Sequence, residues 1–175
     1  MPIRVVLADD HTLVRQALRS LLEREGIQVV GEAQDGQEVI RLAEKYSPDV
    51  AVIDISMPLL NGLDAAHELK RSAPKTKTIL LTRHDEDEYL IGALRAGVKG
   101  YVLKSQAASD LVHAIQLVCR GMVYLSPGMS SVVVDAYLSR LSFPLIQSAR
   151  ANGKFFNWLR KESPQKTLPR CWGSA

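Results

Sequence analysis

Val50–Pro58, VAVIDISMP, is the stretch that decides the fold, because it has the pattern of a buried strand ending on a carboxylate. Val50, Val52 and Ile53 are β-branched, which suits a strand buried on both faces of a parallel sheet. Asp54 ends the strand, and the letters SMPLLNG that follow are typical of a loop. Ligands of open parallel sheets bind outside the carboxyl ends of the strands, so we expect chemistry at Asp54.

Apolar strands and helical patterns alternate on both sides of this stretch. Four more strands are predicted at residues 3–8, 27–33, 78–82 and 100–103. Helical spacing follows each strand, around residues 13–22, 39–43, 63–71, 85–96 and 107–119. This alternation predicts an α/β fold with helices on both faces of the sheet and right-handed crossovers. The pattern predicts a flavodoxin-like architecture, a doubly wound five-stranded parallel sheet of order 2-1-3-4-5.

Charge divides the 175 residues into two chemically different parts. Residues 1–142 carry 16 Lys and Arg against 18 Asp and Glu, whereas residues 143–175 carry 6 against 1. We expect a main domain at 1–120, a partly helical connector at 121–142 and a basic, disordered tail at 143–175.

Composition also narrows the compartment and the class of protein. No apolar run approaches the roughly 20 residues of a membrane span, and the N-terminus has no signal-peptide layout. Cys119 and Cys171 do not make a disulfide framework. These features predict a cytoplasmic protein without a membrane partner.

Polar residues end four of the predicted strands. Asp9 and Asp10 follow the first strand, and Asp54, Thr82 and Lys104 mark the ends of the third, fourth and fifth. These strands are neighbours in a doubly wound sheet, so the side chains should converge. Three carboxylates that close need a cation, and oxygen ligands suit Mg²⁺.

The same residues suggest phosphoryl transfer. Asp54 can attack phosphorus and form an aspartyl phosphate, while Lys104 and Thr82 can contact the phosphoryl group. Each residue alone has a simpler explanation as a turn former, a helix cap or a solvated charge. Their joint position at adjacent strand ends favours the functional interpretation.

Residues 1–120 resemble the receiver domain of two-component response regulators. The resemblance lies in the acidic pair Asp9-Asp10 and in the segments VIDISMPLLNGLDA, LLTRHDEDEYL and AGVKGYVLKS. It implies that Asp54 is the phosphoacceptor for a histidine kinase and that the protein is not an enzyme. It also implies that Asp10, Asp54 and the Ser56 backbone carbonyl hold Mg²⁺, with Asp9 helping through water.

A conformational switch is also implied by the resemblance. Thr82 and Tyr101 resemble the family's switch pair, whose movement remodels the fourth helix and fifth strand, and a homodimer through the fourth and fifth helices is possible. Tyr101 is explained equally well as an ordinary strand aromatic. Two residues depart from the pattern: Arg83 is bulky where many relatives have a small residue, and Ser105 replaces a common proline.

The connector SPGMSSVVVDAYLSRL resembles the NarL/FixJ subfamily, in which a LuxR-type helix-turn-helix follows and regulates transcription. The tail of this chain has no such pattern, so DNA binding is not expected from it. Codons for Ala149–Ser174 can be chosen so that the reading frame one nucleotide earlier encodes PREREVLQLVAEGKSTKDIAAVLGIS. This peptide resembles the opening of a LuxR-type helix-turn-helix. We therefore hypothesise that a frameshift replaced the DNA-binding domain.

Other functions remain open. A Mg²⁺-dependent phosphatase with an aspartate nucleophile would need a second Asp where Ser56 stands. A flavin-binding module would need a hydroxyl-rich phosphate loop where Asp9-Asp10 places negative charge. The chain could also be a phosphate sink that takes up the kinase's phosphoryl groups, or a truncated copy without function. It could be a DNA-binding regulator only if its tail folds.

Overall fold

A computed structural model describes residues 1–83, 87–127, 129–130, 133–134 and 138. The chain divides into two compact units, Met1–Val134 and Asp135–Ala175, and Leu138 is the one described residue of the second. The prediction for the tail at 143–175 therefore lies outside the described residues. Within the partly helical connector predicted at 121–142, residues 129–130, 133–134 and 138 are helical.

Strands and helices alternate along the first unit. The strands are β1 (Arg4–Ala8), β2 (Gln28–Ala33), β3 (Val50–Asp54), β4 (Lys77–Thr82), β5 (Gly100–Leu103) and β6 (Tyr124–Leu125). The α-helices are α1 (Thr12–Arg24), α2 (Gly36–Tyr46), α3 (Gly62–Ser72), α4 (Asp87–Ala96) and α5 (Ala107–Cys119). A short 3-10 turn, Lys104–Gln106, joins β5 to α5.

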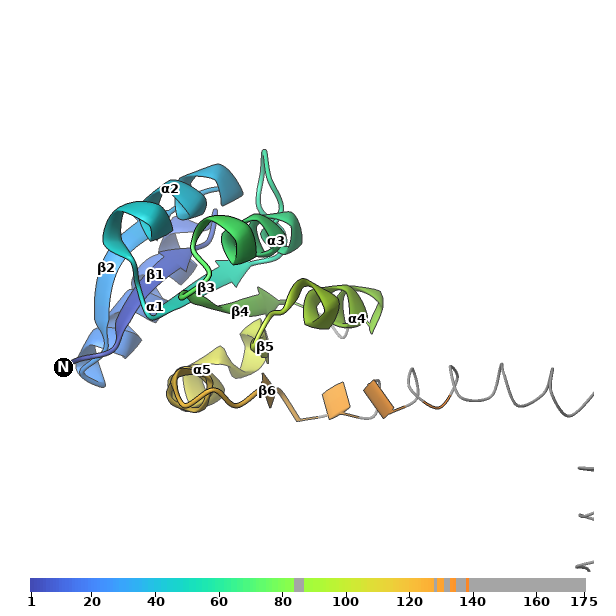
Figure 1. Cartoon of the computed structure of the whole chain (residues 1–175). Helices are drawn as coiled ribbons and strands as arrows, with labels where there is room; N and C mark the ends of the chain where they lie inside the picture. The colour runs from blue at the N-terminus through green and yellow to red at the C-terminus, as the bar shows by residue number, and fades with distance from the viewer. Residues whose placement is uncertain (84–86, 128, 131–132, 135–137, 139–175) are drawn as a thin grey trace, which may run out of the picture. The chain divides into compact units, whose positions relative to one another are not determined.

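The sheet is parallel, in the order β2-β1-β3-β4-β5-β6 (Figure 1). This confirms the predicted α/β fold and the order of its first five strands. The sixth strand was not predicted. Two residues are too short to show a strand period, and Tyr124–Leu125 pairs with Gly100–Tyr101 only once α5 has returned the chain to that edge.

Successive residues of the central strands face two separate cores. Val6, Ala51 and Leu80 belong to the core packed against α2, α3 and α4. Val52 and Ile79 belong to the core packed against α1 and α5. Every residue of β3 is buried, so both faces of this strand are covered and its last residue has a fixed position.

The loop after β3 holds a strained leucine. Leu59 has φ 65°, in the left-handed region that side chains with a Cβ avoid, and it is 82% exposed. We expect Leu59→Gly to stabilise the protein by about 1 kcal/mol, because relief of this strain outweighs the added freedom of the unfolded chain.

Urea denaturation measures this effect, and Leu13 supplies the matched control. Leu13 is equally exposed, at 82%, but lies in α1, so Leu13→Gly should destabilise the protein. Equal destabilisation by both substitutions would contradict the role of strain at Leu59.

Candidate functional site

Asp54 is the last residue of β3, and its side chain is fully buried. The main chain there is held from two sides, since Ile55 N donates to Leu81 O at 3.0 Å and Gly62 N donates to Ile55 O at 2.9 Å. Among the described residues, Asp54 Oδ1 has no hydrogen-bond partner. A buried carboxylate oxygen without a partner is costly, which suggests that this position serves a ligand.

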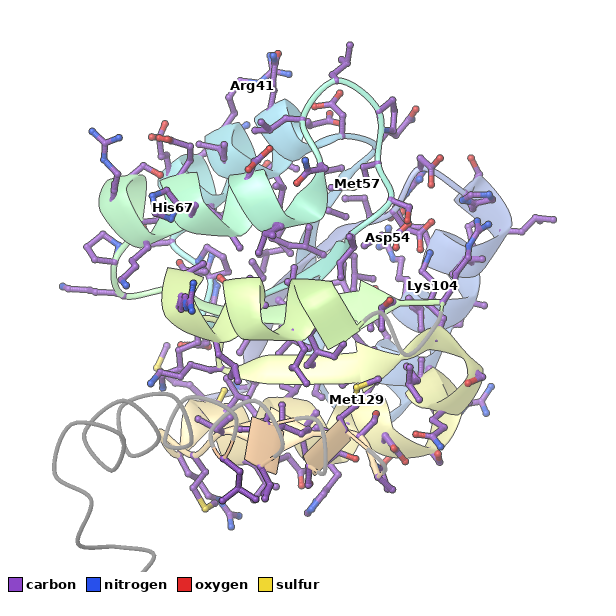
Figure 2. All side chains as sticks on the ribbon, turned by 90° about the vertical axis from the view of Figure 1, so that its right-hand side faces the viewer. Arg41, Asp54, Met57, His67, Lys104 and Met129 are labelled. Atoms are coloured by element: carbon purple, nitrogen blue, oxygen red, sulfur yellow. The ribbon has the colours of Figure 1, made fainter. Side chains whose placement is uncertain are left out.

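Lys104 pairs with two of the predicted carboxylates, and Figure 2 shows it near one of them, Asp54. Its Nζ donates a hydrogen bond to Asp9 Oδ2 at 2.8 Å. Nζ also lies 2.8 Å from Asp54 Oδ2 and forms an ion pair with it. This contact does not have the geometry of a hydrogen bond. β1, β3 and the turn after β5 thus bring together Asp9, Asp54 and Lys104, three of the residues that the sequence singled out, with Asp9 and Asp54 both buried.

The acidic group at these strand ends could hold a metal ion. Asp9, Asp10, His11 and Asp54 each offer a ligand atom, and these atoms lie within 4.8 Å of one another. Lys104 brings one positive charge to three carboxylates, so negative charge remains for a cation to offset. Carboxylate oxygens and the unpartnered Asp54 Oδ1 fit a hard divalent ion such as Mg²⁺.

His11 and Arg83 close one side of this group, and neither was predicted as a site residue. His11 Nδ1 lies 2.6 Å from Asp10 Oδ1, and Arg83 Nη2 lies 2.9 Å from His11 Nε2. A guanidinium only donates, so Nε2 accepts and Nδ1–H donates to Asp10. Arg83 thus reaches from the end of β4 to the loop after β1, where it contacts His11 beside the acidic group.

Arg15 supports the loop after β1 and was also missed. Its side chain is buried, Nη1 donates to the Asp9 carbonyl oxygen, and Nε donates to Glu32 Oε2 at 3.1 Å. The Asp9 side chain in turn accepts from His11 N at 2.8 Å. These contacts set the direction in which the Asp9 carboxylate points.

Thr82 and Tyr101 are both buried and lie on the same face of the sheet. Leu80 pairs with Tyr101 and Thr82 pairs with Leu103, so the two side chains project toward the core packed by α4. Tyr101 therefore is a buried strand aromatic, and its position also suits a partner of Thr82. Ser56 lies two residues after Asp54 and is exposed, while a metal-binding role of its carbonyl stays a prediction.

Comparison with known proteins decides the family. Residues 5–116 match the response regulator receiver domain. The chain belongs to the response regulator receiver family. Among curated relatives it is 35% identical over 136 residues to the transcriptional regulatory protein DegU of Brevibacillus brevis, covering 77% of this chain and 58% of that protein. It is 41% identical over 126 residues to the response regulator GacA of Pseudomonas viridiflava, covering 71% and 59%.

Solved structures agree with this assignment. A LuxR-family response regulator from Aurantimonas sp. has a TM-score of 0.74 and 32% identity, over 79% of this chain and 99% of that one. The isolated receiver domain of RcsB from Salmonella enterica, solved with the phosphomimetic BeF₃⁻, has a TM-score of 0.69 and 30% identity, over 75% and 99%.

This chain is therefore a receiver domain of a two-component response regulator of the NarL/LuxR type. Its relative DegU is named as a transcriptional regulatory protein. It spans less than two thirds of the length of DegU and GacA. In the part of the receiver that the structure describes, no helix is long and apolar enough to cross a membrane.

Proposed function

We propose that this receiver accepts a phosphoryl group on Asp54 from a histidine kinase and changes conformation in response. The observation that carries the proposal is the buried Asp54 carboxylate, with an unpartnered Oδ1 and Lys104 Nζ at 2.8 Å from Oδ2. An Asp54 oxygen attacks phosphorus while the bond from phosphorus to the kinase histidine breaks. The histidine nitrogen keeps the electron pair, and an aspartyl phosphate forms.

Neighbouring side chains of the receiver have separate tasks in this reaction. Lys104, already paired with both buried carboxylates, supplies positive charge to the incoming phosphoryl oxygens. Thr82, at the end of β4, donates a hydrogen bond from its hydroxyl to the bound phosphoryl group, and Tyr101 responds from the same face of the sheet. Intact mass of the full chain after incubation with acetyl phosphate and Mg²⁺ tests the proposal, and an unchanged mass in folded protein would contradict it.

The acidic group would hold Mg²⁺ through Asp10, Asp54 and the Ser56 carbonyl, with Asp9 acting through water. Bound there, Mg²⁺ would offset the negative charge of the transferring group. His11 supports the site by donating to Asp10, which orients this half-buried carboxylate.

Magnesium binding should therefore stabilise the receiver in the absence of any phosphodonor. At a Mg²⁺ concentration of 100 times Kd, the free energy of unfolding should rise by about 2.7 kcal/mol. Urea denaturation measures this rise, with NaCl at equal ionic strength as the control. Asp10→Asn should remove most of the rise, and an equal rise in this variant would contradict the assigned ligand.

The domain organisation, compartment and partners of this protein are proposed from those of its family. We infer a receiver at 1–120, a connector at 121–142 and a tail at 143–175 that does not bind DNA, in a cytoplasmic protein that partners a histidine kinase and can form homodimers. RcsB, a structural neighbour of 30% identity, has been solved as dimers bound to DNA.

The frameshift stays a hypothesis. Coding DNA without helix-turn-helix codons in the adjacent frame would contradict it.

Enzymatic turnover is the alternative from a different class. A phosphatase needs a general acid near the nucleophile, and the residue two positions after Asp54 is Ser56. Curated relatives are regulators, which also favours a stoichiometric phosphoacceptor. Release of many phosphates per chain from a phosphodonor would favour the enzyme, and a single phosphoryl group per chain favours the receiver.

A further inference from the structure

The chain returns to the sheet after α5 and is bonded to β5. Tyr124 N donates to Lys99 O at 2.9 Å, and Ser126 N donates to Tyr101 O at 3.0 Å. The buried Ser126 Oγ accepts from Leu103 N at 3.1 Å. We call residues 124–127 together with Met129 the strap, because they cross the open edge of β5.

Met129 anchors the strap in the core (Figure 2). Its side chain is 1% exposed and belongs to the same core as Tyr101 of β5 and Leu90 of α4. Met129 N donates to Ser126 O at 3.0 Å, which ties the anchor to the bonded part of the strap. By contrast Met122, just before the strap, is 44% exposed.

Helix α5 holds the other side of the strap. The Tyr124 ring packs edge-on against His113, with ring centroids 6.0 Å apart and an interplanar angle of 88°. Burial, and after it the neighbouring Asp110 carboxylate, raises the pKa of Tyr124 to about 12. The strap is therefore packed against β5 and α5, and its anchor shares a core with α4.

We propose that the strap is coupled to the Asp54 site through Tyr101, so that phosphorylation tightens the strap. This inference rests on the proposed function. Tyr101 is the residue at which the two meet: its carbonyl accepts from Ser126, its side chain shares a core with Met129, and Thr82 lies on the same face.

The direction of the coupling follows from packing. In this structure Tyr101 is buried, and movement of its ring out of the core would remove packing beside Met129. A phosphoryl group that draws in Thr82 favours the buried position of Tyr101, and therefore the closed strap. Ser126 and Met129 are positioning residues, since they act on the site through β5: Met129 packs in the core of Tyr101, and Ser126 bonds the Tyr101 carbonyl and the Leu103 amide.

Amide hydrogen exchange of the full chain tests the coupling directly. Beryllofluoride with Mg²⁺, a mimic of the phosphoryl group, should slow exchange at the Ser126 and Met129 amides by about 5-fold or more. The Ile27 amide, bonded to Leu22 O at 2.9 Å away from the strap, should not change. Unchanged exchange at Ser126 and Met129 would overturn the proposal.

Thermodynamic reciprocity gives a second measurement, at the other end of the coupling. Ser126→Ala and Met129→Ala should each weaken beryllofluoride binding, followed by ¹⁹F NMR, by about 5-fold or more. Met122→Ala makes the same substitution outside the strap and should leave the affinity unchanged. Equal affinities in all four proteins would overturn the coupling.

The two proposals fail in different ways. If acetyl phosphate adds a phosphoryl group to Asp54 while exchange in the strap stays the same, the proposed function stands and the coupling is wrong. If folded protein gains no phosphoryl group and binds no beryllofluoride, the proposed function is wrong and the coupling falls with it.

Discussion

Incubated with acetyl phosphate and Mg²⁺, the full chain should gain one phosphoryl group, about 80 Da, and Asp54→Asn should gain none. The asparagine amide has almost the shape of the aspartate carboxylate, but it is not a nucleophile that attacks phosphorus. Lys104 keeps its hydrogen bond to Asp9 in the variant, so the fold should be preserved. Intact mass reports the phosphoryl group, and circular dichroism checks the fold.

Asp64→Asn is the matched control for this loss. Asp64 is exposed in the first turn of α3, outside the acidic group, so its replacement should leave the gain in mass intact. A phosphoryl group that persists in Asp54→Asn would show that another side chain is the acceptor. Loss in both variants would point to a general effect of the substitutions.

Gly62→Ala should destabilise the receiver by about 3 kcal/mol, because a Cβ at this position would overlap the main chain of Asp54. The nearest atoms are the Asp54 carbonyl oxygen and carbon and the Ile55 Cα, all of them backbone. No side-chain movement can make room, so α3 must shift away from the end of β3. The phosphoacceptor should move with it, and phosphorylation should slow.

Gly92→Ala provides a control with the opposite sign. Gly92 lies within α4, and the nearest atom to an added Cβ is Leu63 Cδ2 at 3.4 Å, the end of a flexible side chain. Alanine favours a helix interior over glycine by up to about 1 kcal/mol. Urea denaturation should therefore give opposite shifts for the two variants, and similar shifts would contradict the close approach at Gly62.

Sequence reasoning predicted the order of five strands and the residues that meet at their ends, because both follow from alternation and topology. Asp54 and Lys104 are far apart in sequence, yet parallel strands place their carboxyl ends together, and the structure has these side chains 2.8 Å apart. The switch pair and the Ser56 carbonyl stay predictions about chemistry that geometry alone does not test.

The missed contacts depend on tertiary structure. Arg15 has the sequence pattern of an exposed helical charge, and its burial depends on Glu32, which β2 brings beside α1. Arg83 meets His11 only because β4 and β1 both end at the same edge of the sheet. A hint existed for His11, which directly follows the acidic pair, but a lone histidine there is equally a loop residue.

The buried Met129 has a consequence for how this module can be divided. The family match ends at residue 116, yet the core takes a side chain from 13 positions later in the sequence. A protease nick or a gene fusion junction just after α5 would remove that side chain and uncover the main-chain edge of β5. The hydrophobic core of this receiver therefore extends past α5, and we expect a junction beyond the strap to preserve the domain better than one directly after α5.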